Sequence, residues 1–256
     1  MSAARLEISR ANPVARLLAA LVLAVALVFS VDWVSALTAL VLETVLLLAS
    51  GIPLGRFLRR SLPILVAALL TGLTILLYGQ PSGRVHVDVL LITVSDGSIE
   101  LAIATVLRVL AIGLPSVLFF ADMDPTELAD GLAQVLRLPA RFVLGALAAF
   151  RLVGLMRQDW LYLGYARRAR GVADHGRVRR VAGQAFALLV FAVRRGAKLA
   201  TAMEARGFGA HPTRTWARPS SLRGSDYALV ALGLAVGLVS VALAVATGWW
   251  NFIGAR

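Results

Sequence analysis

The chain has 256 residues, of which 59% are hydrophobic and 16% are charged, and its mean hydropathy is +0.81. Soluble domains contain about 45–50% apolar residues, so this composition excludes an ordinary soluble protein and indicates an integral membrane protein. Cysteine is absent, which excludes disulfides, thiolate catalysis and cysteine-based metal sites. The three histidines lie too far apart to form a ligand pair on one helix face, so we expect no metal site and no cofactor.

The net charge of +12 sets a second limit. In a soluble protein it would favour a nucleic-acid partner. In a membrane protein the same excess of arginine is typical of cytoplasmic loops that face anionic lipids. We therefore expect this charge to face the lipid bilayer, and we expect no nucleic-acid partner.

Five apolar runs are long enough to cross a bilayer, a crossing that needs about 20 residues: 14–31, 34–50, 61–79, 99–120 and 227–249. The first run lacks a small-residue cleavage site and leads at once into the second, so we expect a retained span and no cleaved signal peptide. Arginines gather at the start of the first run and between the second and third. By the positive-inside rule we expect the N-terminus in the cytoplasm and the C-terminus outside the cell membrane.

The loop between the third and fourth runs, residues 80–98, then lies outside. It contains the alternating sequence VHVDVLLITV. Alternation of this kind predicts a strand, or a segment that lies against the membrane surface.

Two shorter apolar stretches, 142–156 and 181–193, pose the question of a further membrane hairpin. Such a hairpin would place seven arginines outside, against the orientation rule. Residues 151–223 carry 15 basic and 3 acidic residues. We therefore expect an all-α membrane protein with about five spans in three regions: four N-terminal spans in 1–120, long cytoplasmic amphipathic helices in 121–225, and a C-terminal span in 226–256.

The sequence DMDPTEL is the first candidate for chemistry. Asp124 as the N-cap, Pro125 as the first helical residue and Glu127 two positions later predict a helix start. The same carboxylates, with Asp130, also allow a metal-dependent phosphotransferase. Such enzymes need further aspartates downstream, and here only the widely spaced Asp159, Asp174 and Asp226 follow.

Two ionisable residues fall inside predicted spans, Glu43 in the second and Arg108 in the fourth. Charges at membrane depth are costly, and an ion pair between these two would lower the cost. Packing and a substrate pathway both remain open as roles, and the second would make the chain a stand-alone carrier. No phosphate-binding loop of the form GxxxxGK[ST] is present, so any energy from ATP must come from a partner.

The triplet Ala-Arg-Gly occurs twice, as Ala169, Arg170 and Gly171 and again as Ala205, Arg206 and Gly207. Each copy follows a stretch predicted to be helical, 151–169 and 186–205. One interpretation is two ordinary helix ends, because glycine favours the left-handed turn after a helix and arginine suits its negative end. The other is a pair of docking tips whose arginines bind carboxylates on a dimeric partner.

The segments FFADMDPTEL, FRLVGLMRQDWLYLGYARRARG and RRGAKLATAMEARGFG together resemble the transmembrane T component of energy-coupling factor importers, the EcfT/CbiQ-like family. The resemblance implies a non-catalytic scaffold in a bacterial or archaeal cell membrane that joins two ABC ATPase subunits to a small membrane S component. It also implies uptake of a vitamin or transition-metal ion, with the two Ala-Arg-Gly motifs inserted into the ATPases. The adjacent Arg167 and Arg168 offer alternative contacts at the first motif.

Overall fold

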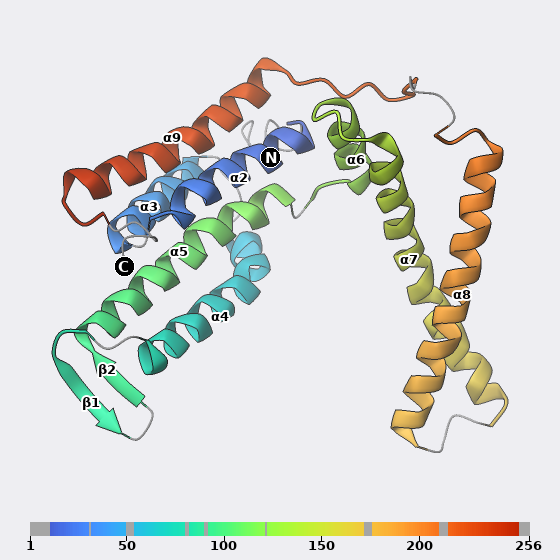
Figure 1. Ribbon diagram of the computed structural model, residues 1–256, viewed down its shortest axis with the longest axis horizontal. Coiled ribbons are helices and arrows are strands. Elements are labelled where there is room, and N and C mark those ends of the chain that lie inside the picture. Colours follow the sequence, from blue (N-terminus) through green and yellow to red (C-terminus); the bar gives the residue numbers. More distant parts are fainter. Residues whose placement is uncertain are drawn as a thin grey trace. The chain divides into compact units, whose positions relative to one another are not determined.

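The computed structural model describes residues 11–30, 32–49, 54–79, 82–89, 92–120, 122–171, 176–209 and 215–250. Two compact units make up the chain, Met1–Leu128 with Ser221–Arg256 as unit 1 and Ala129–Ser220 as unit 2. Figure 1 shows the helices and the small hairpin. The helices are α2 Pro13–Val28, α3 Trp33–Ala49, α4 Leu54–Tyr78, α5 Asp96–Phe120, α6 Pro125–Gln134, α7 Ala140–Ala169, α8 Arg177–Ala205 and α9 Gly224–Ala246.

All five predicted spans fall on helices of unit 1. Within the described residues, three helical segments are long and apolar enough to cross a membrane: Phe57–Tyr78 of α4, Asp96–Phe120 and Gly224–Ala246. The other two, α2 and α3, are apolar helices of 16 and 17 residues, and the predicted span ends Val31 and Ser50 lie outside the described residues. The predicted all-α membrane class is confirmed.

Glycines bring α9 close to α2. A Cβ on Gly233 would lie 2.7 Å from the carbonyl oxygen of Ala19, and one on Gly237 would lie 2.8 Å from the Cβ of Ala26. Small residues four positions apart allow this close approach of two membrane helices. The adjoining core consists of Leu23, Leu27, Ala39, Ala111 and Val236.

Polar contacts show which helix ends lie together in unit 1. Asp226, which is 1% exposed, accepts the backbone N–H of Asn12 at 2.8 Å and that of Arg223 at 2.7 Å, so α2 and α9 begin at the same end. At the opposite ends of these helices, the rings of Trp33 and Trp249 meet edge to face with centroids 5.8 Å apart. Short connections then make α2, α3, α4 and α5 run in alternating directions.

The extracellular-loop prediction corresponds to a two-stranded hairpin. Strand β1, Val85–Val89, pairs antiparallel with β2, Ile92–Ser95, and Val89 faces Ile92 in the register. His86 Nε2 lies 2.6 Å from Asp96 Oδ1, at the start of α5. The alternating sequence therefore forms two strands that satisfy each other's backbone groups, where the sequence analysis expected one strand or a surface segment.

Unit 2 contains two long helices that cross. Helix α7 has 30 residues and α8 has 29, so both begin about ten residues earlier than the predicted stretches 151–169 and 186–205. Neither is among the helices apolar enough to cross a membrane. Figure 1 shows the crossing, with α7 and α8 running in opposite directions.

Candidate functional site

The first Ala-Arg-Gly motif ends α7. Ala169 is the last helical residue, and Arg170 follows as the C-cap with φ −90° and ψ 4°. Gly171 then adopts φ 67°, in the left-handed region where a side chain is disfavoured. The Gly171 N–H donates to the carbonyl of Arg168 at 3.0 Å.

The second motif repeats this geometry at the end of α8. Arg206 is the C-cap with φ −90° and ψ 12°, and Gly207 has φ 73°. The Gly207 N–H donates to Glu204 at 2.9 Å, and the Phe208 N–H donates to the Met203 carbonyl at 3.0 Å. The two triplets therefore form the same local structure, in which the glycine turns the chain away directly after the arginine.

Both motif arginines are exposed at these tips. The neighbouring arginines have contacts within unit 2: Arg167 Nη1 donates to the Arg180 carbonyl at 3.2 Å, and the Arg168 guanidinium lies 5.9 Å from the Tyr165 ring centroid. Arg167, named above as an alternative contact, is thus directed toward α8. Arg170 and Arg206 are the arginines that project from the two turns.

The net charge of the chain is concentrated in the segment that contains the two tips. Residues 151–223 carry 15 basic and 3 acidic residues, whereas the remainder of the chain carries acidic and basic residues in equal number. The whole net charge of +12 thus belongs to this segment. A surface of this kind attracts acidic partners and speeds their association.

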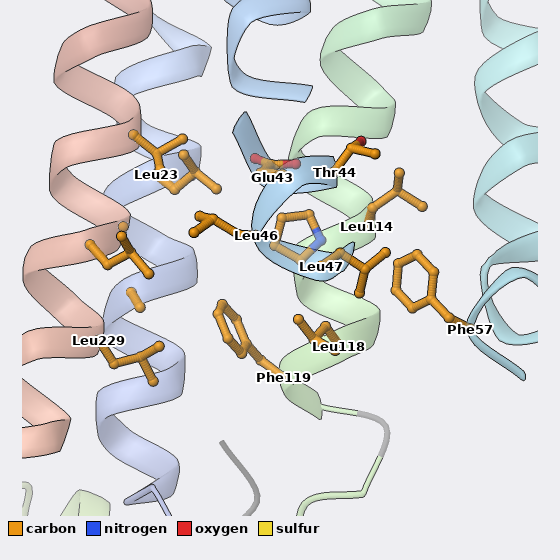
Figure 2. A pocket seen from close by; sticks show the side chains of 15 residues that line it. Leu23, Glu43, Thr44, Leu46, Leu47, Phe57, Leu114, Leu118, Phe119 and Leu229 are labelled. Carbon is orange, nitrogen blue, oxygen red and sulfur yellow. The ribbon is translucent and has the colours of Figure 1, made fainter. Parts of the chain in front are cut away.

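The predicted Glu43–Arg108 pair is not formed. An Arg108 Nη donates to the Ser30 carbonyl instead. Both carboxylate oxygens of Glu43 are buried and have no hydrogen-bond partner in the described part of the chain. Glu43 lines an apolar cavity of about 200 Å³ in unit 1. Figure 2 shows its side chain together with Leu23, Leu46 and Leu114, which also line the cavity.

At the start of α6, Asp124 Oδ1 accepts the backbone N–H of Thr126 at 2.8 Å, and Pro125 is the first helical residue. Glu127 lies in the first turn of this helix. No group of three or more His, Asp or Glu side chains that could hold a metal ion occurs within the described residues. The geometry at Asp124 is therefore that of a helix cap.

Comparison with known proteins decides the family. The model of the family described as "CbiQ: Cobalt transport protein" matches residues 6–216, which is most of the chain. The chain belongs to this CbiQ family. Two relatives are each named "Energy-coupling factor transporter transmembrane protein EcfT". The protein of Exiguobacterium sibiricum is 28% identical over 209 residues, covering 77% of this chain and 79% of the relative.

The second EcfT protein, from Limosilactobacillus fermentum, is 28% identical over 191 residues, or 68% of this chain and 71% of the relative. The predicted resemblance to the EcfT/CbiQ-like T components is thereby confirmed. This CbiQ-family chain is a transmembrane component of a transporter, which agrees with a non-catalytic subunit of the cell membrane.

Two aspartates of the CbiQ-family chain have roles that the sequence analysis missed. Asp226 joins the starts of α2 and α9, and Asp159 forms an ion pair with Arg195, 36 positions later. In the sequence both stand out only as widely spaced carboxylates. The one signal in the sequence was the spacing of Asp159 and Arg195, which equals the spacing of the two motif arginines.

Proposed function

We propose that the chain is the energy-coupling scaffold of an energy-coupling factor importer. It joins a pair of ABC ATPases, identical or different, to a small membrane S component for uptake of a vitamin or a transition-metal ion. Residues 1–120 and 226–256 provide five spans with the N-terminus inside and the C-terminus outside. Residues 121–225 form the cytoplasmic coupling region.

The observation that carries this proposal is the repeated tip: two helices of nearly equal length end in the same exposed Arg-Gly turn. The guanidinium group is a planar fork that can bind a carboxylate through two parallel hydrogen bonds. Gly171 and Gly207 turn the chain away, which leaves room for the walls of a cleft. Two equal tips match the two equivalent clefts of a dimer.

Coupling follows from the geometry of the helices. Each tip is the end of a rigid helix of about 45 Å at 1.5 Å per residue. When ATP closes the ATPase dimer, the clefts move toward each other and carry the tips with them. The helices transmit this movement to the S component, so the scaffold itself performs no chemistry.

The test is co-purification from the native membrane in mild detergent. Wild-type protein should bring two ATPase subunits and a small membrane protein, whose identity would indicate the substrate. The double variant Arg170→Glu with Arg206→Glu should lose the ATPases. The matched control is Arg157→Glu with Lys198→Glu, which makes the same change in net charge at exposed positions on α7 and α8 away from the tips.

Retention of the ATPases by the double tip variant would overturn the docking role of the motifs. If wild type itself purified alone, the stand-alone carrier with Glu43 and Arg108 and the metal-dependent phosphotransferase with Asp124, Glu127 and Asp130 would have to be tested. The carrier predicts uptake into liposomes without ATPases. The phosphotransferase predicts activity that depends on a divalent metal.

A further inference from the structure

Polar contacts hold α7 and α8 together. Arg195 Nη1 lies 2.7 Å from Asp159 Oδ2, and Arg195 Nη2 lies 3.5 Å from Asp159 Oδ1, so both carboxylate oxygens face the guanidinium. The side chain of Asp159 is 20% exposed. Gln184, which is 3% exposed, donates from Nε2 to the Trp160 carbonyl at 3.2 Å.

Hydrophobic burial contributes little to this helix pair. No residue of α7 is buried, and Gln184 is the buried side chain on the described part of α8. Large apolar side chains on both helices remain exposed, among them Phe142, Phe150, Phe186 and Val193. The mutual position of α7 and α8 therefore depends on a few directional polar contacts.

The ion pair occupies equivalent positions in the two helices. Asp159 precedes Arg170 by 11 residues, and Arg195 precedes Arg206 by 11 residues. Contacts run antiparallel, because Asp159 meets Arg195 whereas Arg167, further along α7, meets the earlier Arg180. When equivalent positions of two antiparallel helices touch, a local two-fold axis passes through the contact, as in an isologous interface.

This position makes the pair equidistant from the tips. Eleven residues of α-helix span about 16 Å, so the two motif arginines lie on opposite sides of the pair and about 30 Å apart. A charged contact between equivalent positions of α7 and α8 requires opposite charges, because two copies of the same charged side chain would repel each other. The two helices also lie close together at Gly183 of α8, where an added Cβ would lie 3.0 Å from a guanidinium nitrogen of Arg167 on α7.

We propose that Asp159 and Arg195 are positioning residues that form the pivot between α7 and α8, and that this pivot sets the spacing and opposed direction of the two Ala-Arg-Gly tips. The role of the pivot in transport rests on the proposed function. The spacing itself is a property of the chain alone. It can therefore be tested without ATPases.

The first experiment measures the distance between the tips by pulsed electron spin resonance. The chain has no cysteine, so Arg168→Cys with Glu204→Cys, two equivalent positions two residues before the motif arginines, can be spin-labelled specifically. The otherwise unchanged protein in detergent should give one narrow distribution within about 30–40 Å. Asp159→Ala should broaden that distribution at least two-fold.

The charge swap Asp159→Arg with Arg195→Asp is the decisive variant, and it should restore the narrow distribution. A distribution unchanged by Asp159→Ala would overturn the pivot. A swap that stays as broad as Asp159→Ala, while its circular dichroism shows unchanged helix content, would also overturn it. If Asp159→Ala loses helix content, Asp159→Asn replaces it, because the amide keeps the shape of the side chain and removes the charge.

The second experiment separates the pivot from the scaffold proposal. In the complex with ATPases and S component, Asp159→Ala should keep the ATPases bound through intact tips and lower uptake per ATP hydrolysed at least five-fold, with recovery in the charge swap. Unchanged uptake per ATP in Asp159→Ala would overturn the role of the pivot in transport. The scaffold proposal is tested separately, by whether mutation of Arg170 and Arg206 releases the ATPases. Failure of the pivot and failure of the scaffold proposal are therefore distinguishable.

Discussion

At the scale of single residues, Gly207 is a position in the second motif where the backbone restricts the choice of side chain. Its φ of 73° is left-handed, a conformation that costs other residues about 1–2 kcal/mol. We expect Gly207→Ala to lower the thermal midpoint of the helical signal and to reduce ATPase binding several-fold, because relief of the strain rotates Arg206. Gly196→Ala is the matched control, since a Cβ there meets nothing within 4 Å inside a helix.

In that control, replacement of a helical glycine should leave stability unchanged or raise it by up to about 1 kcal/mol. Gly207→Asn should be milder than Gly207→Ala, because asparagine tolerates the left-handed region. Equal midpoints and equal ATPase binding for Gly207→Ala and Gly196→Ala would show that the turn after α8 has no influence on the tip.

Glu43 is a second residue whose surroundings destabilise the folded protein. Its carboxyl oxygens are buried without a partner beside an apolar cavity, and an unsatisfied buried polar group costs about 1–3 kcal/mol. We expect Glu43→Leu to raise the thermal stability of the detergent-solubilised protein, because leucine makes apolar contacts with the cavity wall and removes the penalty. A functional role for Glu43 would appear as lower uptake despite the higher stability. A fall in melting temperature for Glu43→Leu would contradict this account.

At the scale of helices, the contact of α9 with α2 depends on Gly233. A Cβ there would lie 2.7 Å from a backbone oxygen of Ala19, and backbone cannot move aside as a side chain can. We expect Gly233→Val to separate the helices and to destabilise the folded protein by at least about 1–3 kcal/mol, the usual cost of overpacking. Gly224→Val is the control, because a Cβ at Gly224 has no neighbour within 4 Å. The stabilities of the two variants are compared by thermal unfolding, monitored by tryptophan fluorescence.

Sequence reasoning located the helices of unit 1 well, because an apolar run of about 20 residues has few alternatives. It placed the starts of α7 and α8 too late. Residues 140–150 are apolar apart from Arg141 and resemble part of a short membrane segment, and the arginines at 177, 179 and 180 precede the apolar part of α8. It could not choose partners for charged side chains. Arg108 reaches the Ser30 carbonyl rather than Glu43, and hydropathy alone does not say which faces of two helices meet.

The site was predictable to a similar degree. The two Ala-Arg-Gly motifs are visible as letters, and glycine after a helix predicts the left-handed turn that Gly171 and Gly207 adopt. The contact between Asp159 and Arg195 was not predicted, because it depends on how two helices cross. The sequence shows only that Asp159 and Arg195 each precede a motif arginine by 11 residues. This spacing indicates a contact only when α7 and α8 are known to run antiparallel.

At the scale of the whole molecule, the unequal distribution of charge bears on how the chain lies in the membrane. The net positive charge resides in residues 151–223, and from the positive-inside rule we expect unit 2 in the cytoplasm. The alternative, in which residues 142–156 and 181–193 form a membrane hairpin, places the first motif outside. Single cysteines in the cysteine-free chain distinguish the two arrangements.

We expect a membrane-impermeant maleimide, added to intact cells, to label Arg84→Cys beside the β hairpin and to leave Arg168→Cys and Glu204→Cys unlabelled. All three positions are exposed, so each should react once the membrane is permeabilised, which controls for accessibility. Labelling of Arg168→Cys in intact cells would favour the membrane hairpin. The first tip could then not reach a cytoplasmic ATPase, and the scaffold proposal would fail together with its two-tip geometry.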